Sequence, residues 1–212
     1  MIFFIMPALP DPASSPSPKM LEHYWQQGLS FPAYMQGMQD IIHQQKTLDN
    51  PPLVDKFQYY ILNQQRSQRL LKTYVVSAQL SSLLKQVEPQ HWLIITEYWC
   101  GDSAQNLPPL FRMSESSDGK INLRLVFRDT NPQLIEAFAT EGAKSIPKVL
   151  MLSKDFTLKD IWGPRPAEAQ ALVKSLRADP ATRDFYADRL HLWYAQNKCH
   201  MLEQEIANLL MQ

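Results

Sequence analysis

The sequence predicts an α/β fold in which a mixed central sheet is flanked by helices. Two segments rich in β-branched and aromatic residues, at 92–99 and 120–129, are each followed by a segment with helical spacing. A pair of short strands separated by a turn comes next, at 147–155 and 157–163. Strands that alternate with helices in this way are typical of a layered α/β protein.

Helical patterns dominate the regions on either side of these strands. Residues 19–88 contain almost no glycine, and we expect two or three helices there. One is predicted over 32–45, and the apolar spacing from Tyr60 to Leu80 predicts a second, amphipathic helix after a break at 48–53. Helices are also predicted over 131–142 and 166–178, and a single long helix over 181–211.

We therefore divide the chain into four parts. The first is a flexible leader rich in proline and serine, and it is followed by a helical extension, an α/β domain and a C-terminal helix that packs on this domain. Their predicted bounds are 1–18, 19–88, 89–178 and 179–212.

Composition excludes several classes of function. Lys and Arg together number 21 and so do Asp and Glu, which leaves no basic surface for nucleic acid or anionic lipid. The apolar run at the N-terminus ends at Pro7 with no Lys or Arg before it, so it does not match a signal peptide. No run approaches the roughly 18 apolar residues of a membrane span. We expect a soluble, cytoplasmic protein.

Cysteine and histidine usage argues against a metal centre. The chain has two cysteines, Cys100 and Cys199, and five scattered histidines, with none of the spacings typical of zinc sites. We expect no metal and no resident cofactor.

The segment TEYWCGDSAQNLPPL contains the main candidate for chemistry, because it places Cys100 between a buried strand and a helix. A thiol at the first turn of a helix faces unpaired N–H groups and the positive end of the macrodipole. The neighbouring Asp102 raises the pKa of the thiol, whereas the hydroxyl of Ser103 can donate a hydrogen bond to the sulfur and lower it. On balance we expect the pKa of Cys100 below the free value of about 8.5.

This segment resembles the active-site turn of thioredoxins, whose motif is Trp-Cys-Gly-x-Cys. Trp99, Cys100 and Gly101 match it, and Ser145-Ile146-Pro147 looks like the cis-proline loop of that fold. Pro108 or Pro109 matches the proline that kinks the helix after the cysteine. The resemblance covers about residues 90–178. It is closest to a bacterial group of thioredoxin-like proteins with a helical N-terminal extension, whose motifs here are Trp99 to Pro108, Arg128 to Asn131, Ser145 to Lys148 and Trp162 to Pro166.

The resemblance implies a thioredoxin-like fold and assigns roles to particular residues. Cys100 would be the nucleophile, with Ser103 beside it in the catalytic motif. The substrate would contact the remaining residues of both motifs, which are Trp99, Gly101, Asp102, Ser145, Ile146 and Pro147. A cis bond before Pro147 would leave the carbonyl of Ile146 and the backbone of Ser145 free to pair with an extended peptide.

The chain departs from thioredoxins at Ser103, where a second cysteine would release the product. Three hypotheses stay open. Cys100 acts as a monothiol oxidoreductase whose mixed disulfide is cleared by a low-molecular-weight thiol, a partner protein or Cys199. Alternatively, Cys-Gly-Asp-Ser resembles the monothiol glutaredoxin site that holds an iron–sulfur cluster with glutathione. In the third, the fold is a non-catalytic module for protein binding. The partner is accordingly a protein or small molecule that carries a thiol or disulfide.

Other polar residues receive structural interpretations. Arg66 and Arg69 could approach the site but are more typical of a solvated helix face. We expect Arg165 to pair with a carboxylate such as Asp129. Glu97, three residues before Cys100, is a candidate general base.

Overall fold

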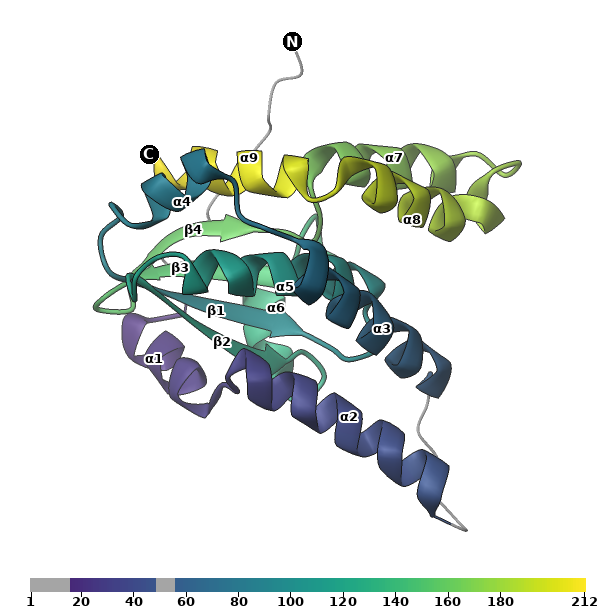
Figure 1. The fold of residues 1–212 in the computed structure, drawn as a ribbon, viewed down its shortest axis with the longest axis horizontal. Coiled ribbons are helices and arrows are strands. Elements are labelled where there is room, and N and C mark those ends of the chain that lie inside the picture. Colours follow the sequence, from purple (N-terminus) through teal and green to yellow (C-terminus); the bar gives the residue numbers. More distant parts are fainter. Residues whose placement is uncertain (1–15, 49–55) are drawn as a thin grey trace.

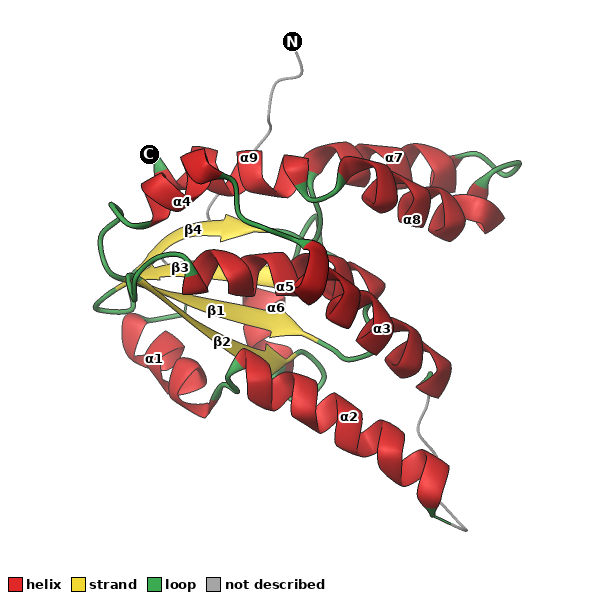
Figure 2. Cartoon of the chain, viewed as in Figure 1, coloured by secondary structure: helices red, strands yellow, loops and turns green. Residues whose placement is uncertain are grey.

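A mixed sheet of four strands forms the centre of the molecule, which we describe from a computed structural model over residues 16–48 and 56–212 (Figure 2). The strands lie in the order β2-β1-β3-β4. β1 pairs in parallel with β2 and antiparallel with β3, and β3 pairs antiparallel with β4. Their bounds are Gln90–Thr96 (β1), Ile121–Phe127 (β2), Lys148–Ser153 (β3) and Leu158–Trp162 (β4). The predicted α/β fold with a mixed sheet is confirmed.

β1 is buried on both faces, which explains its nearly continuous apolar sequence. Trp92 and Ile94 pack into one hydrophobic core, and Leu93 and Ile95 pack into a second core on the other face of the sheet. Helix α5 (Gly101–Glu115) covers the first face and α3 (Phe57–Thr73) packs beside it, whereas α6 (Pro132–Ala137) lies behind the sheet (Figure 1). The C-terminal end of β1 therefore lies between two layers of helices.

The part of the N-terminal region that the structure describes holds four helices, where we expected two or three. α1 (Pro18–Gln27) and α2 (Phe31–Thr47) precede α3, and α4 (Ala78–Leu84) follows it. The predicted helix from Tyr60 to Leu80 is interrupted, because Tyr74 is extended and Ser77 caps a new helix by accepting a hydrogen bond from the Leu80 N–H at 3.3 Å. The predicted leader, apart from its last few residues, lies outside the described residues.

The C-terminal prediction of one long helix is wrong. A 3₁₀ turn at Arg183–Phe185 leads into α8 (Tyr186–Asn197), and α9 (His200–Leu210) follows after a bend. Lys198 and Cys199 form this bend with φ of 50° and 69°, in the left-handed region that ends a helix. α7 (Ala167–Ala178) agrees with its prediction, whereas α6 is shorter than the predicted 131–142.

Two glutamates of α9 join it to distant parts of the chain. Glu203 accepts hydrogen bonds from the hydroxyl of Tyr74 at 2.6 Å and from the N–H of Ser77 at 3.2 Å. Glu205 accepts from the indole N–H of Trp162 and the N–H of Ala167, both at 2.7 Å. The helix thus connects the α3–α4 region to β4 and the first turn of α7.

Helices α2 and α3 also fix the segment that leads into the candidate site. The side-chain amide of Asn63, on α3, donates a 2.9 Å hydrogen bond to the carbonyl of Tyr98. Gly37, on α2, lies against the ring of Tyr98, and a Cβ at this glycine would be only 2.4 Å from the Tyr98 hydroxyl. Tyr98, two residues before Cys100, is therefore held in place by both α2 and α3.

Candidate functional site

The Cys100 sulfur lies where two segments distant in sequence meet. Cys100 is the N-cap of α5, and its sulfur accepts a hydrogen bond from the N–H of Ser103 at 3.4 Å. The thiol donates to the carbonyl of Ile146 at 3.3 Å, and the Ile146–Pro147 peptide bond is cis. The motif at the end of β1 and the Ser145–Pro147 loop are therefore brought together at this sulfur.

The thiol is buried, with an exposed fraction of 7%. The pKa of Cys100 is raised to about 11, mainly by burial and also by the charge of Asp102, and hydrogen bonds from Ser103 oppose this rise. The expected fall in this pKa is therefore wrong. A helix N-terminus contributes about 1 kcal/mol or less, below one pKa unit, whereas complete burial shifts a pKa by up to several units.

Cys199 forms no disulfide with Cys100, and the contact of Ser103 with the Cys100 sulfur comes from its backbone N–H. Ser103 is completely buried, and its hydroxyl oxygen accepts a 2.8 Å hydrogen bond from Thr96. Cys199 is a free, half-buried thiol in the bend between α8 and α9. Burial and the charge of Glu203 raise the pKa of Cys199 to about 12, opposed by Arg69.

The carboxylate of Asp102 is bound by two long-range partners. Arg165, in the loop after β4, forms an ion pair with Oδ2, and Tyr194 of α8 donates to Oδ1 at 2.8 Å. Asn106 donates to the Tyr194 hydroxyl at 3.0 Å. Although burial acts to lower it, hydrogen bonding and charge from Asp102 raise the pKa of Arg165 overall. The expected pairing of Arg165 with a carboxylate is therefore confirmed, but its partner is Asp102 and not Asp129, which was named as the example.

Two side chains that sequence reasoning did not assign to the site lie beside Gly101. A Cβ at this glycine would be 3.4 Å from Nη1 of Arg66 on α3 and 3.5 Å from Cε1 of His191 on α8. Burial lowers the pKa of His191, and the charge of Arg66 lowers it further. Arg66 was predicted on a solvated face, where Arg69 does lie exposed. The helical spacing from Tyr60 that we identified places Arg66 near Asn63, but nothing in the sequence marks His191.

Trp99, on the other side of Cys100, contacts two cations. Nζ of Lys56 and the guanidinium carbon of Arg128 lie 4.5 Å and 4.7 Å from its ring centroid. Glu97 accepts a 2.8 Å hydrogen bond from the N–H of Asp129, and burial raises the pKa of Glu97. Its carboxylate therefore anchors the loop after β2, and a role as general base stays a prediction.

Two backbone groups predicted to be free for substrate are occupied. The N–H of Ser145 donates to the carbonyl of Ala143 at 2.8 Å, and the carbonyl of Ile146 accepts the thiol hydrogen of Cys100. A substrate that paired with Ile146 would therefore have to displace this thiol contact.

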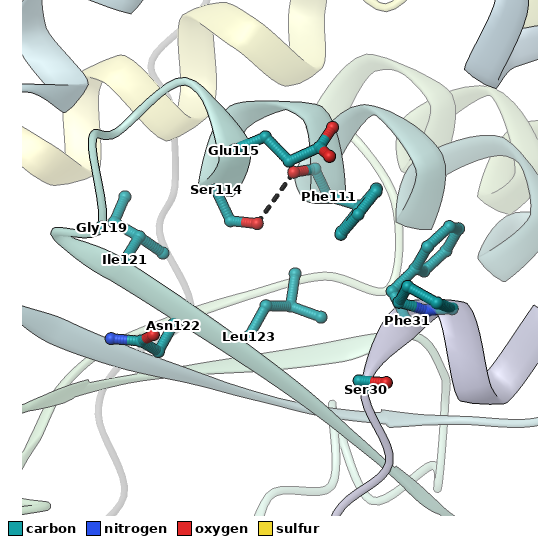
Figure 3. Close-up of a pocket in the computed structure, with 10 residues that line it drawn as sticks. Ser30, Phe31, Phe111, Ser114, Glu115, Gly119, Ile121, Asn122 and Leu123 are labelled. Atoms are coloured by element: carbon teal, nitrogen blue, oxygen red, sulfur yellow. Dashed lines mark hydrogen bonds between the residues drawn. The ribbon is translucent and has the colours of Figure 1, made fainter.

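A shallow pocket of about 300 Å³ lies at the opposite end of α5 from Cys100 (Figure 3). It contains none of the predicted site residues. Its lining comes from the start of α2, the end of α5 and the start of β2, and consists of Ser30, Phe31, Pro32, Phe111, Ser114, Glu115, Gly119, Ile121, Asn122 and Leu123.

Within residues 16–48 and 56–212, no three His, Cys, Asp or Glu side chains gather closely enough to hold a metal ion. None of the described helices is both long and apolar enough to cross a membrane.

A known protein family matches the part of the chain that contains Cys100 and the Ser145–Pro147 loop. A family model described as thioredoxin matches residues 52–177, which is more than half of the chain. The chain belongs to the thioredoxin family. This match begins within the helical region, so it includes α3 and α4 as well as the strands.

Solved structures show the same thioredoxin-like fold. A protein of unknown function from Pseudomonas aeruginosa is similar with a TM-score of 0.59 and 17% identity, over 89% of this chain and 95% of its own. An HIV epitope scaffold is similar with a TM-score of 0.50 and 18% identity, over 70% of this chain and 79% of its own. No curated protein matches this thioredoxin-family chain.

Proposed function

We propose that this protein is a single-cysteine thioredoxin-like protein of the bacterial WCGD-x-AQN type, which acts in the cytoplasm by thiol–disulfide exchange at Cys100. The observation that supports it is the position of the sulfur. It lies at the N-terminus of α5 and within hydrogen-bond distance of the carbonyl that precedes Pro147.

The proposed step is a disulfide exchange with no net change in oxidation state. Cys100 loses its proton to a solvent base, and the thiolate attacks one sulfur of an external disulfide. The new bond joins Cys100 to that sulfur, and the other half leaves as a thiolate that takes up a proton. Because Ser103 cannot form a disulfide, the mixed disulfide persists until a second external thiol attacks it.

Burial of the thiol limits the rate of this step. With a pKa of about 11, only about one Cys100 in ten thousand is a thiolate at neutral pH. We therefore propose slow exchange that accelerates as the pH rises. Displacement of the Ile146 contact by a bound substrate would also be required for attack.

The pH dependence of Cys100 alkylation by iodoacetamide tests the proposal. Each cysteine is followed separately by mass spectrometry, with Cys199 as an internal comparison and Cys100→Ser as the control for peptide assignment. We expect the rate at Cys100 to rise through the alkaline range, and glutathione disulfide to add one glutathionyl group there. Thermal unfolding of the modified protein shows whether the native fold is kept. No addition at Cys100 by either reagent in the folded protein would contradict the proposal.

The exposed fraction of 7% favours a second candidate, a non-catalytic binding module. In that case Cys100 would be a core residue on which the fold depends. Cys100→Ala would then lower the thermal midpoint of unfolding, while the native protein would resist alkylation until denatured. Modification of the native protein together with a stable Cys100→Ala variant would contradict this second candidate.

A further inference from the structure

Arg66 is a half-buried cation that forms no ion pair within residues 16–48 and 56–212. Its Nη1 donates a 3.1 Å hydrogen bond to Oδ1 of Asn63, which is a neutral amide. Burial lowers the pKa of Arg66, and the neighbouring charge of Arg69 lowers it further. A guanidinium usually binds carboxylate or phosphate through several of its five N–H donors. Arg66 uses one of them for Asn63, so it retains donors that could bind an anion.

The remaining donors of Arg66 lie close to the turn that contains Cys100. Its Nη1 lies beside Gly101, the residue that follows Cys100. His191 approaches the same glycine from α8, and its Nδ1 is buried without a hydrogen-bond partner in the part of the chain that the structure describes. The first turn of α5 adds the positive end of its macrodipole.

The acidic groups near Arg66 leave this charge largely uncompensated. The charge of Asp102 favours the charged form of Arg66. Both oxygens of this carboxylate are already bound, however, one by Arg165 and the other by Tyr194. Asp188 lies near His191 and is exposed. The side of Gly101 formed by α3 therefore carries the Arg66 guanidinium, and the nearby carboxylate of Asp102 is already bound by Arg165 and Tyr194.

We propose that Arg66 is a specificity-determining residue that binds an anionic group of a small disulfide as it reacts with Cys100. This inference rests on the proposed exchange at Cys100 and names its substrate class, a low-molecular-weight disulfide bearing carboxylates. His191 supplies a second polar contact to the same group.

The helices around the site favour a small substrate over a folded protein. α3 and α8 bring Arg66 and His191 close to Gly101, and Trp99 on the other side is flanked by Lys56 and Arg128. Cys100 itself is buried between these groups. A compact molecule has to displace the thiol contact with the Ile146 carbonyl, whereas an extended peptide that pairs with this loop also has to displace the hydrogen bond of the Ser145 N–H.

A series of three small symmetrical disulfides tests the charge preference. Dithiodiglycolate carries two negative charges, bis(2-hydroxyethyl) disulfide is neutral, and cystamine carries two positive charges. The rate of mixed-disulfide formation at Cys100 is measured by mass spectrometry in full-length protein with Cys199→Ser. Each rate is divided by that of free cysteine with the same disulfide, which removes differences in intrinsic reactivity. We expect the corrected rate for the anionic disulfide to exceed that for the cationic one by about tenfold, falling at high salt.

Arg66→Gln identifies the residue responsible, and Arg69→Gln is its matched control. Both remove one positive charge from the same helix, but Arg69 is exposed. We expect the anionic-to-cationic rate ratio to fall to about twofold in Arg66→Gln and to change little in Arg69→Gln. Arg66→Lys should restore part of the ratio, because it returns the charge without the planar fork. Circular dichroism and thermal unfolding show whether each variant is folded.

The outcomes separate this inference from the proposed function. Modification of Cys100 with a corrected ratio near one, or an equal loss of ratio in Arg66→Gln and Arg69→Gln, overturns the role of Arg66 and leaves exchange intact. No mixed disulfide with any of the three reagents overturns the exchange itself.

Discussion

Tyr194 of α8 donates a 2.8 Å hydrogen bond to Oδ1 of Asp102 in the first turn of α5, while Arg165 binds the other oxygen of this carboxylate. The charge nearest to the Cys100 thiol is therefore fixed by two elements from the C-terminal half of the chain. Burial and this charge together keep the pKa of the thiol high.

Asp102→Asn should lower the pKa of Cys100 and destabilise the fold. The substitution removes the negative charge that opposes the thiolate, so the pH midpoint of Cys100 alkylation should fall. It also leaves Arg165 buried without its counter-ion, which we expect to reduce the free energy of unfolding by about 3 kcal/mol. Urea denaturation measures this loss. Tyr194→Phe keeps the charge and removes only one hydrogen bond, so a smaller loss of stability is expected; an equal loss in both variants would contradict the role of the ion pair.

Ser103→Cys should introduce reduction of insulin disulfides, which we expect to be absent in the natural chain. The N–H of Ser103 lies 3.4 Å from the Cys100 sulfur, so a thiol at this position would be adjacent to the mixed disulfide and could displace the product. Turbidity of insulin with dithiothreitol as reductant is the measurement. The double variant Cys100→Ser, Ser103→Cys is the control, because it has a thiol only at the second position. A folded Ser103→Cys protein without activity would show that more than the resolving cysteine is missing.

Gly163→Ala should be strongly destabilising. Gly163 has a φ of +112°, and a Cβ there would lie 2.3 Å from the carbonyl oxygen of Pro147, which is backbone and cannot rotate away. Gly142→Ala is the matched control, since Gly142 also has a positive φ, of +78°, but nothing within 4 Å of its Cβ position. We expect a loss of about 1 kcal/mol in the control and at least twice as much in Gly163→Ala, measured by urea denaturation. Similar losses would mean that close approach to Pro147 is unimportant.

Acidification should lower the thermal stability of the protein through His91. This ring stacks on Phe156 at 4.5 Å and lies 4.5 Å from Trp25, and burial lowers the pKa of His91 below its usual value of 6.5. The unfolded chain therefore takes up the proton first, so the stabilising contribution is complete above about pH 6.5 and is lost as the pH falls. His191, whose pKa is also lowered, acts in the same direction.

The measurement for this prediction is the difference between thermal midpoints at about pH 7.5 and about pH 5. His91→Phe should reduce this difference, since it keeps an aromatic ring in the stack and removes the titrating group. His43→Gln, at an exposed position of α2, should leave the difference as it is in the natural chain. A difference unaffected by His91→Phe would assign the acid sensitivity to other groups.

The strands and the position of Cys100 could be predicted because their patterns are local. β1 is apolar throughout because both of its faces are buried, and the β3–β4 pair is bounded by proline and a short turn. The helix breaks at Tyr74 and Lys198 were missed because neither contains glycine or proline, and the apolar spacing continues on both sides.

The electrostatics of the site depended on contacts that sequence spacing does not reveal. The partner of Arg165 was assigned incorrectly because Asp102 and Asp129 both follow strands, and only packing decides which carboxylate is reached. The direction in which the Cys100 pKa shifts from its free value was predicted incorrectly for a related reason. A helix N-terminus is readable in sequence, whereas the side chains that bury it come from α3, α8 and the Ser145–Pro147 loop.

The contact between Gly37 and Tyr98 constrains how related chains can diverge. Because a side chain at position 37 would meet the phenol of Tyr98, a mutation at either residue alters what the other tolerates. Homologues that carry a larger residue at position 37 should therefore carry a smaller one at position 98, as a covarying pair. The residue at position 98, two before Cys100, thus evolves together with a position on α2 some sixty residues earlier in the sequence.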